Sequence, residues 1–191
     1  MAFPPRLPLI YAIVLAAGAA TRFGSPKQRL LLPEVLERVH RTSVDDVVVV
    51  LGAYDVETDA RVVRCPEWAE GPGASLRCGL AALPPEAEAA VVVLADGPDL
   101  APQAVERVIG EWRASGDPVV AASYGGERGH PVLLARSVWG TVPDEGARGL
   151  PTRLVPCDDL GAPGDVDRPD EVPARLRERP DAAARDRGDD R

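Results

Sequence analysis

The chain has 191 residues, of which 45% are hydrophobic and only 4% are aromatic, and its formal net charge is −8 at pH 7. This length suits one domain, and the low aromatic content predicts a core of Val, Leu, Ile and Ala. The acidic balance argues against general nucleic-acid binding, which needs a concentrated basic face. No apolar run is long enough to span a membrane, and residues 1–10 lack the long apolar stretch of a signal peptide, so we expect a cytoplasmic protein with no membrane partner.

Short apolar runs alternate with helical patterns along the first two thirds of the chain. In chain order, the predicted elements are strand 11–16, helix 34–41, strand 46–51, helix 74–83, strand 90–95, helix 102–115 and strand 118–122. Continuous apolar runs indicate strands that are covered on both faces, as in parallel sheets. The order therefore predicts an α/β fold: a three-layer α/β/α sandwich with a Rossmann-like, mostly parallel sheet, whose ligands lie beyond the carboxyl ends of the strands.

The last third of the chain predicts shorter elements. They are a strand at 130–135 that could run antiparallel, a short helix near 137–141, a strand at 153–156 and a helix at 169–177 with a proline in its first turn. The expected division is an N-terminal extension at 1–10, a single domain at 11–178 and a charged tail at 179–191, which we expect to be disordered.

Cysteine and histidine contribute little chemistry to this interpretation. Cys65, Cys78 and Cys157 have neither the even number of a disulfide framework nor the CxxC spacing of a zinc site, so we expect reduced, buried or half-buried thiols. We expect His130 to pack or hydrogen-bond near a substrate pocket rather than to act as a catalytic base. We expect His40 to lie at the surface, at the end of a helix.

The loop after the first predicted strand combines small residues with two cations. It contains Gly18, Arg22, Gly24 and Lys27, just before a helix, and Lys27 is the only lysine in the chain. Glycine permits a close approach of the backbone, while N–H groups, a helix start and a compact ammonium favour phosphate. The loop matches neither GxxxxGK[ST] nor GxGxxG, so by itself it predicts either an anion site or an ordinary glycine-rich turn.

Carboxylates follow at two later points. Asp96 comes directly after the apolar run at 90–95, where a ligand for Mg²⁺ is expected, whereas Asp99 suits a turn or the start of a helix. Asp165 and Asp167 both occur in GDVDRPD, and we expect only one of them to face a given metal. We choose Asp167; read in isolation, the segment is also compatible with an ordinary acidic loop.

Taken together, the motifs resemble one family. LAAGAATRFGSPKQ, GASLRCGL, LADGPDL, GHPVLL, GAR and DVDRPD follow one another in a fixed order. From about residue 13 to 172 the chain resembles the MobA-like nucleotidyltransferases, in particular their molybdenum cofactor cytidylyltransferase branch. This resemblance implies the nucleotide-diphospho-sugar transferase type of fold.

The resemblance also implies roles for individual residues. Catalytic roles would belong to Lys27, Arg22 and Asp96, with Lys27 and Arg22 on the phosphates and with Asp96 and Asp167 holding Mg²⁺. The nucleotide would be bound by Leu15, Ala16, Ala17, Gly18, Arg22, Gly24, Lys27, Ser75 and Asp96. The substrate pocket would include Gly129, His130 and Arg148.

The activity that the resemblance implies is transfer of a nucleoside monophosphate from a triphosphate, with release of pyrophosphate. CTP is favoured over GTP, the acceptor would be a phosphorylated pterin such as molybdopterin or the molybdenum cofactor, and a molybdoenzyme would be the maturation partner. Two alternatives stay open. One is a non-catalytic nucleotide-binding accessory protein, and the other is a nucleotidyltransferase with a sugar-phosphate or phospholactate acceptor.

Three departures from the family pattern bear on specificity. Residues 29–38 read RLLLPEVLER, without the glycine-containing turn that normally follows the KQ dipeptide. The connection at 51–61 is short, and Arg168 replaces the usual Thr of the last motif. Because the missing turn helps to shape the nucleotide pocket in such folds, the choice of base stays open at this point.

Overall fold

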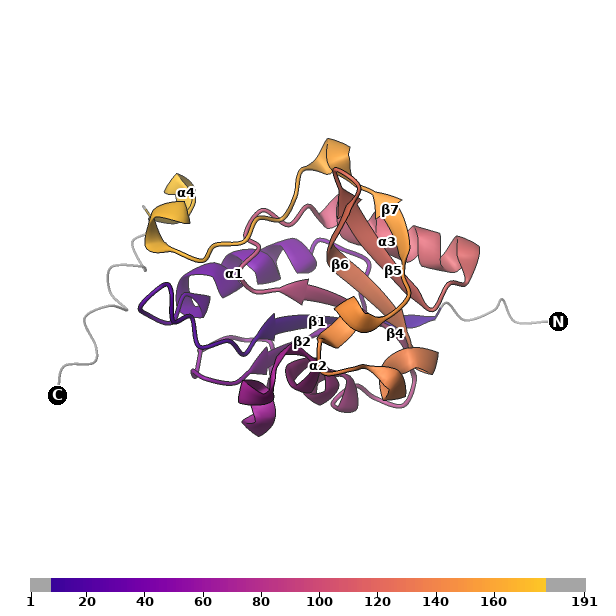
Figure 1. Ribbon diagram of the computed structural model, residues 1–191, viewed down its shortest axis with the longest axis horizontal. Helices are drawn as coiled ribbons and strands as arrows, with labels where there is room; N and C mark the ends of the chain where they lie inside the picture. Colours follow the sequence, from indigo (N-terminus) through magenta and orange to yellow (C-terminus); the bar gives the residue numbers. More distant parts are fainter. Residues whose placement is uncertain (1–7, 178–191) are drawn as a thin grey trace.

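In the computed structural model, which describes residues 8–177, a seven-stranded sheet lies between two layers of helices (Figure 1). The strands are β1 (Leu9–Ala16), β2 (Asp46–Leu51), β3 (Arg61–Arg64), β4 (Ala87–Leu94), β5 (Val119–Tyr124), β6 (Glu127–Ala135) and β7 (Arg153–Pro156). Their order across the sheet is β3-β2-β1-β4-β6-β5-β7, and only β6 runs antiparallel to its neighbours. The predicted three-layer, mostly parallel α/β fold is therefore confirmed.

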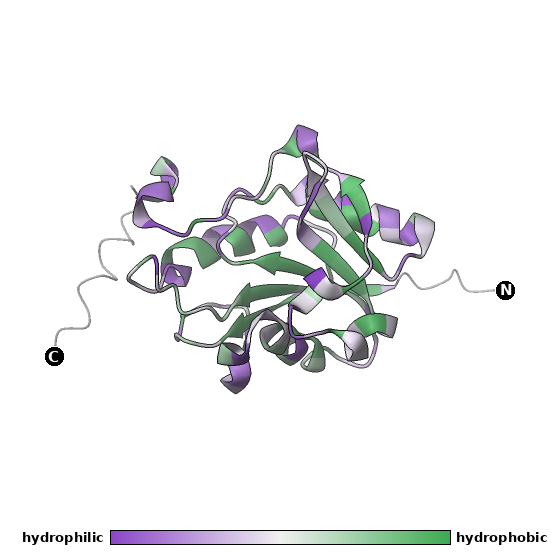
Figure 2. Cartoon of the chain, viewed as in Figure 1, coloured by the Kyte–Doolittle hydropathy of each residue, from purple (hydrophilic) through white to green (hydrophobic). Residues whose placement is uncertain are grey.

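Helices cover both faces of this sheet. The α-helices are α1 (Gln28–Val39), α2 (Pro72–Ala81), α3 (Pro102–Ser115) and α4 (Ala174–Arg177). The 3₁₀ segments are η1 (Pro66–Glu70), η2 (Arg136–Thr141), η3 (Gly146–Gly149), η4 (Asp158–Leu160) and η5 (Pro169–Glu171). Helices α1 and α3 pack on one face, α2 packs on the other, and the strands between them are the most hydrophobic part of the ribbon (Figure 2). Among the described residues, no helix has the length and hydropathy needed to cross a membrane.

Strand β2 shows how a continuous apolar run serves two layers at once. Val47, Val49 and Leu51 belong to the core under α1 and α3, whereas Val48 and Val50 belong to the core under α2. Successive side chains of a strand point to opposite faces, so a strand covered on both sides needs apolar residues at every position. The parallel arrangement then brings the carboxyl ends of β1, β2 and β4 to one edge of the sheet.

Helix α1 begins earlier than the sequence predicts. The expected helix at 34–41 starts at Gln28, so the RLLLPEVLER segment is helical throughout and Pro33 lies inside the helix. The proline removes one donor from the helix and led to the wrong boundary. The helix persists because it buries a stripe with helical spacing, namely Leu31, Leu32, Val35, Leu36 and Val39.

The C-terminal end of the described chain contains less helix than the sequence predicts. A continuous helix at 169–177 is wrong, because η5 and α4 are separated at Val172 and Pro173. Proline disfavours the helical conformation for the residue before it, which explains the break.

Strand β3 was not predicted, since its RVVR sequence is short and lies largely exposed at the sheet edge. The tail at 179–191 lies outside the described residues.

The prediction that all three cysteines are free thiols is also wrong. Cys65 and Cys78 form a disulfide, with their Cα atoms 5.7 Å apart, whereas Cys157 is free and buried as expected. Cys65 follows β3 and Cys78 lies in α2, so the pairing depends on how α2 docks beside the sheet edge. Counting cysteines could not reveal this proximity.

Candidate active site

The site lies beyond the carboxyl ends of β1 and β4. These strands pair in parallel up to Leu15 and Leu94, and the Ala95 N–H continues the contact by donating to the Leu15 carbonyl at 3.0 Å. The loop that leaves β1 is attached to the end of β2, because the Ala53 N–H donates to the Ala17 carbonyl at 3.0 Å. The sheet thus fixes both the start of this loop and the position from which Asp96 projects.

The loop itself offers unused backbone donors. Within residues 8–177, no hydrogen bond uses the N–H groups of Gly18, Ala19 or Ala20. The Gln28 side chain donates to the Gly18 carbonyl at 2.7 Å and so ties the loop to the first turn of α1. Gly24 has a φ of +81°, in the left-handed region that glycine enters without steric cost. Free N–H groups next to a helix start are a suitable cradle for an anion.

Lys27 lies at the start of α1 with its side chain only 10% exposed. Its ammonium contacts Asp96 Oδ2 at 3.0 Å and Asp167 Oδ1 at 3.4 Å, and it donates to the Val166 carbonyl at 2.7 Å. Arg22, which is largely exposed, forms an ion pair with the other oxygen of Asp167. The structure therefore brings together the four charged residues that were predicted to form one site.

Asp167 reaches this edge through a coil segment that runs beside the end of β4. The Val166 N–H donates to the backbone carbonyl of Asp96 at 3.1 Å. Beyond it, the Glu171 carboxylate accepts hydrogen bonds from the N–H groups of Asp167 at 2.7 Å and Arg168 at 2.9 Å. These bonds hold the Asp167 backbone at both ends, and so they orient its carboxylate toward Lys27.

A cavity of about 170 Å³ lies among these groups. Its lining residues are Leu15, Ala16, Gly18, Ala20, Thr21, Arg22, Lys27, Gln28, Ala95, Asp96 and Asp167. Asp96 Oδ1 and Gln28 Oε1 are buried there, and neither has a hydrogen-bond partner within residues 8–177. An unpartnered buried carboxylate oxygen is costly unless a ligand satisfies it, and two carboxylates are suitable donors for Mg²⁺ or another hard divalent cation. The residues present therefore fit such an ion.

A second cavity, of about 350 Å³, opens on the other side of the end of β4. It is lined by Val93, Leu94, Gly97, Leu100, Tyr124, Glu127, Arg128, Gly129, His130, Ala162, Pro163, Gly164 and Asp165. Asp165 and Asp167 line different cavities because they lie in a coil segment; on a regular strand, residues two apart would share a face. Partial burial raises the pKa of Asp165, and the nearby charges of Asp96 and Asp167 add to this effect.

His130 lines this second cavity in a neutral form. Its Nδ1 lies 3.2 Å from the Val92 carbonyl, and burial lowers the pKa of the imidazole. A neutral ring that donates Nδ1–H to a carbonyl fits the expected positional role better than that of a base. Gly129 beside it allows close packing, because a Cβ there would lie 2.8 Å from the Tyr124 ring.

Arg128 was missed at the sequence level, although it shapes the same cavity. Its guanidinium donates to the carbonyls of Ala147 at 2.8 Å, Leu150 at 3.4 Å and Arg148 at 3.5 Å, and so it fastens η3 beside β6. Burial lowers the pKa of Arg128, with a further contribution from the Arg148 charge. The Arg148 side chain is exposed and does not line the cavity. The GAR segment therefore reaches the pocket through the backbone contacts that Arg128 makes.

The SLRCGL motif has a structural explanation within α2. A Cβ at Gly79 would lie 2.8 Å from Ile13 and 2.9 Å from Val50, so glycine lets the helix pack closely on the sheet. Arg77 donates to the Val142 carbonyl and pairs with Asp144, each at 3.1 Å. Ser75 is buried in the same helix and is not among the residues that line either of these two cavities.

Comparisons with known proteins agree with this fold. The family model described as the MobA-like NTP transferase domain matches residues 12–153. The solved structure of Rv0371c from Mycobacterium tuberculosis is 30% identical with a TM-score of 0.74, over 86% of this chain and 96% of that one. A manganese complex of Rv0371C from the same organism is 28% identical, with a TM-score of 0.60 over 78% of this chain and 88% of that one.

A more distant structure extends the likeness of fold. A nucleotidyl transferase from Methanothermobacter thermautotroptrophicus is 20% identical, with a TM-score of 0.66 over 93% of this chain and 99% of that one. No curated protein sequence matches the chain. The family model, which covers most of the described residues, decides the assignment: the chain belongs to the MobA-like NTP transferase family and is a nucleotidyltransferase.

Proposed function

We propose that the chain transfers CMP from CTP to the phosphate of molybdopterin or of the molybdenum cofactor, with Mg²⁺ as its cation and pyrophosphate as the second product. The observation that carries this proposal is the convergence of Lys27, Arg22, Asp96 and Asp167 on one cavity at the carboxyl ends of β1 and β4. Both signs of charge occur there, as a metal–triphosphate complex requires.

The triphosphate would lie along the loop between Ala16 and Lys27. The free N–H groups of this loop would donate to phosphate oxygens, and the Arg22 and Lys27 side chains would neutralise their charge. Because charge builds up on the leaving pyrophosphate as its bond breaks, cations held in place before the reaction favour the transition state over the ground state.

The carboxylates of Asp96 and Asp167 would hold the divalent cation. The unpartnered Asp96 Oδ1 supports this assignment, and so does the manganese complex of the Mycobacterium tuberculosis relative. When bound, the cation would supply Lewis-acid neutralisation of the triphosphate oxygens. Mg²⁺ is favoured because it selects carboxylate and phosphate oxygens over nitrogen or sulfur ligands.

The acceptor would attack the α-phosphorus with a phosphate oxygen. A phosphate monoester is already anionic near neutral pH, so the reaction requires no strong general base. The chain would act mainly by alignment and charge neutralisation. A neutral, carbonyl-bound His130 supports this mechanism, because the imidazole would be needed for positioning only.

The second cavity suits a flat acceptor with several donors. Its walls include the apolar side chains of Leu94, Leu100 and Pro163, and its polar groups include the carboxylates of Glu127 and Asp165. A pterin ring presents an amino group and a ring N–H side by side. A carboxylate can accept one hydrogen bond from each of these groups at the same time. Mostly apolar walls with a few directed polar groups are typical of a small-molecule pocket.

The choice of CTP rests on the sequence resemblance to the cytidylyltransferase branch. The same resemblance suggests a molybdoenzyme as the partner that receives the product. The triphosphate loop and the carboxylates would serve any nucleoside triphosphate in the same way.

The proposal is tested by measuring pyrophosphate release in a matrix of substrates. Each of the four nucleoside triphosphates would be incubated with Mg²⁺ and with molybdopterin, a sugar phosphate or phospholactate as acceptor. We expect release with CTP and molybdopterin only, and none in excess EDTA. Release with another acceptor would overturn the pterin assignment, whereas binding of CTP without turnover by any acceptor would indicate a non-catalytic nucleotide-binding protein.

A further inference from the structure

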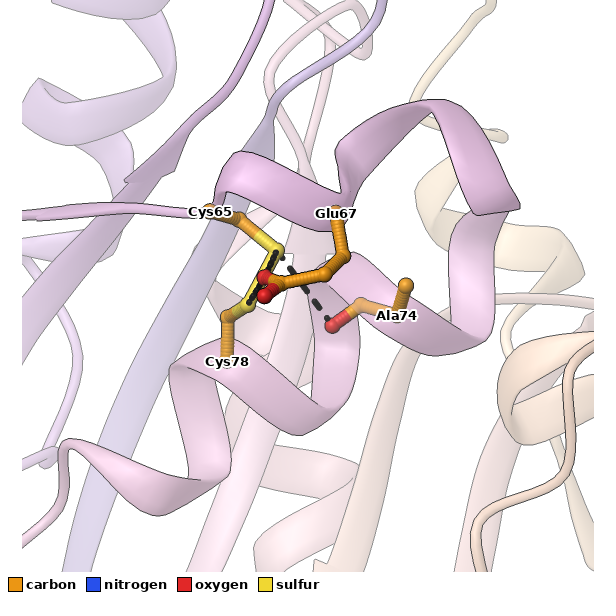
Figure 3. The surroundings of a disulfide bond; sticks show 4 residues. All are labelled: Cys65, Glu67, Ala74 and Cys78. Carbon is orange, nitrogen blue, oxygen red and sulfur yellow. Dashed lines mark hydrogen bonds between the residues drawn. A yellow bond between two sulfur atoms is a disulfide. The ribbon is translucent and has the colours of Figure 1, made fainter.

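A cross-link joins the two segments that follow β3. The disulfide connects Cys65, at the start of η1, to Cys78 in α2, and the two Cα atoms lie 5.7 Å apart (Figure 3). The bond therefore closes a loop that contains η1 and the first two turns of α2. We propose that Cys65 and Cys78 form a reversible dithiol–disulfide pair that controls how firmly the chain holds its nucleoside triphosphate. The control of nucleotide affinity rests on the proposed function, whereas the redox chemistry does not.

Hydrogen-bond acceptors lie close to both sulfurs of the pair. Glu67 Oε2 lies 3.9 Å from Cys65 Sγ and 3.8 Å from Cys78 Sγ, and the Ala74 carbonyl lies 3.6 Å from Cys65 Sγ (Figure 3). Disulfide sulfurs carry no proton, so in the oxidised state these are contacts only. Reduction gives each sulfur a proton to donate to an acceptor that is already within reach. Each thiol of the dithiol state thus has a hydrogen-bond acceptor nearby.

The two sulfurs differ in access, which fixes the course of the exchange. Cys65 is 1% exposed, whereas Cys78 is half-buried. One thiolate of an external dithiol would attack Cys78 Sγ, the disulfide would break, and Cys65 would leave as a thiolate and take up a proton. The second thiolate of the reductant would then attack the mixed disulfide and release Cys78. The reductant loses two electrons and two protons, and the chain gains them.

Glu67 sets the rate of this exchange. Its carboxylate lies beside both sulfurs, so its negative charge disfavours the Cys65 thiolate that leaves and also the thiolate that must form on reoxidation. Replacement of Glu67 by glutamine removes the charge and keeps the shape of the side chain. The variant should therefore exchange faster in both directions, which a purely structural role of Glu67 would not produce.

The loop closed by the disulfide lies against the start of the triphosphate loop. A Cβ at Gly52 would lie 2.5 Å from Trp68 Cβ and 2.7 Å from the Ala17 carbonyl, so η1, the end of β2 and Ala17 meet without a gap. Ala16 and Gly18, on either side of Ala17, line the cavity with Lys27 and Asp96. The cross-link restrains η1, and η1 in turn supports the wall of the nucleotide cavity.

The setting favours a regulatory bond over a permanent one. An enzyme that consumes CTP works where nucleoside triphosphates are made, in a compartment that keeps most thiols reduced. Disulfides in such compartments are mostly transient, catalytic or redox-sensing. Cys157 is buried at the far side of the sheet and remains free, so the pair has no competing thiol partner nearby.

The redox half of the proposal is tested on the full-length protein by alkylation after unfolding. Oxidised protein should carry one alkyl group, on Cys157, and protein reduced with dithiothreitol should carry three. Equilibration in buffers of reduced and oxidised dithiothreitol should give one reversible transition, and Glu67→Gln should approach it faster than wild type. Three reactive thiols after treatment with a disulfide-forming oxidant, or one tightly bound Zn²⁺ per reduced chain that Cys78→Ser abolishes, would overturn the proposal.

The coupling is tested by titrating both redox forms with CTP and Mg²⁺ in a calorimeter. The reduced protein should bind about fivefold more weakly than the oxidised protein. The Cys65→Ser and Cys78→Ser variants should bind CTP as weakly as the reduced wild-type protein, under both oxidising and reducing conditions. Equal affinities of the two wild-type forms would overturn the coupling. If neither form bound any nucleoside triphosphate, the proposed function would fail, while the alkylation result would still decide the redox chemistry.

Discussion

Lys27 and Asp96 form a largely buried ion pair, with Nζ and Oδ2 3.0 Å apart, where β1 and β4 end side by side. The same ammonium also contacts Asp167 and the Val166 carbonyl, so a single cation holds two distant parts of the chain together. This arrangement makes Lys27 the residue whose loss should affect the proposed reaction most.

Lys27→Ala should lower kcat by at least about 100-fold, because it removes a fixed cation from the developing charge of the leaving group. The variant should remain folded in Mg²⁺, since the cation can replace the ammonium between the two carboxylates. Steady-state kinetics and circular dichroism measure the two effects. Arg113→Ala is the matched control, because Arg113 is an exposed cation of α3 far from the cavity. Normal turnover by Lys27→Ala would contradict the assignment.

The metal site is tested with Mn²⁺, whose binding can be followed by its electron paramagnetic resonance signal without any turnover. Asp96→Asn and Asp167→Asn should each weaken Mn²⁺ binding by at least about tenfold, since each removes a charged oxygen ligand. Asp165→Asn should bind Mn²⁺ almost as wild type does, because Asp165 lines the other cavity. A weaker effect of Asp167→Asn than of Asp165→Asn would show that Asp165, and not Asp167, is the ligand.

Arg128→Ala should raise the KM for the acceptor more than the KM for CTP. The guanidinium fastens η3 through three backbone carbonyls, and its loss would free one wall of the second cavity. Arg136→Ala is a matched control. Arg136 likewise donates to backbone carbonyls, those of Pro84 and Ala87, but it lies away from the cavity. If both variants changed the KM values alike, Arg128 would have only a general stabilising role.

His130 should make the stability of the fold depend on pH. Burial lowers the pKa of the folded imidazole below its ordinary value of 6.5, and the charges of Arg128 and Arg148 act in the same direction. Below that value the unfolded state binds a proton that the folded state does not, so the free energy of unfolding falls as the pH decreases. The slope is at most about 1.4 kcal/mol per pH unit.

Urea unfolding between pH 7 and pH 5 measures this contribution. His130→Gln retains a donor for the Val92 carbonyl but cannot take up a proton, so its unfolding free energy should fall less steeply with decreasing pH than that of wild type. Parallel curves for the two proteins would show that His130 does not titrate differently in the folded state.

The parts of the fold that could be predicted are those with one dominant pattern. The five consecutive apolar residues at 47–51 are typical of a strand covered on both faces, and α3 was predicted with its observed bounds because its apolar stripe has no proline. The start of α1 could not be predicted in the same way. Pro33 argues locally for a break, and only the docked helix shows that the buried leucines around it outweigh the lost hydrogen bond.

The site could be predicted in part for a related reason. The position of Asp96 follows from the rule that ligands lie at the carboxyl ends of parallel strands. The approach of Asp167 could not be derived from periodicity, because it depends on the backbone bond from Val166 to Asp96 in a coil segment. Arg128 and the Cys65–Cys78 bond were missed for the same reason, since both depend on how irregular segments dock.

The most direct test of the central claim follows the two ends of the triphosphate separately. CTP labelled with ³²P at the α-phosphate and CTP labelled at the γ-phosphate would each be incubated with the protein, Mg²⁺ and molybdopterin. Nucleotidyl transfer predicts that the α label appears in the acceptor product and the γ label in pyrophosphate. Transfer of the γ label to the acceptor, or hydrolysis of CTP with no labelled acceptor, would contradict the account.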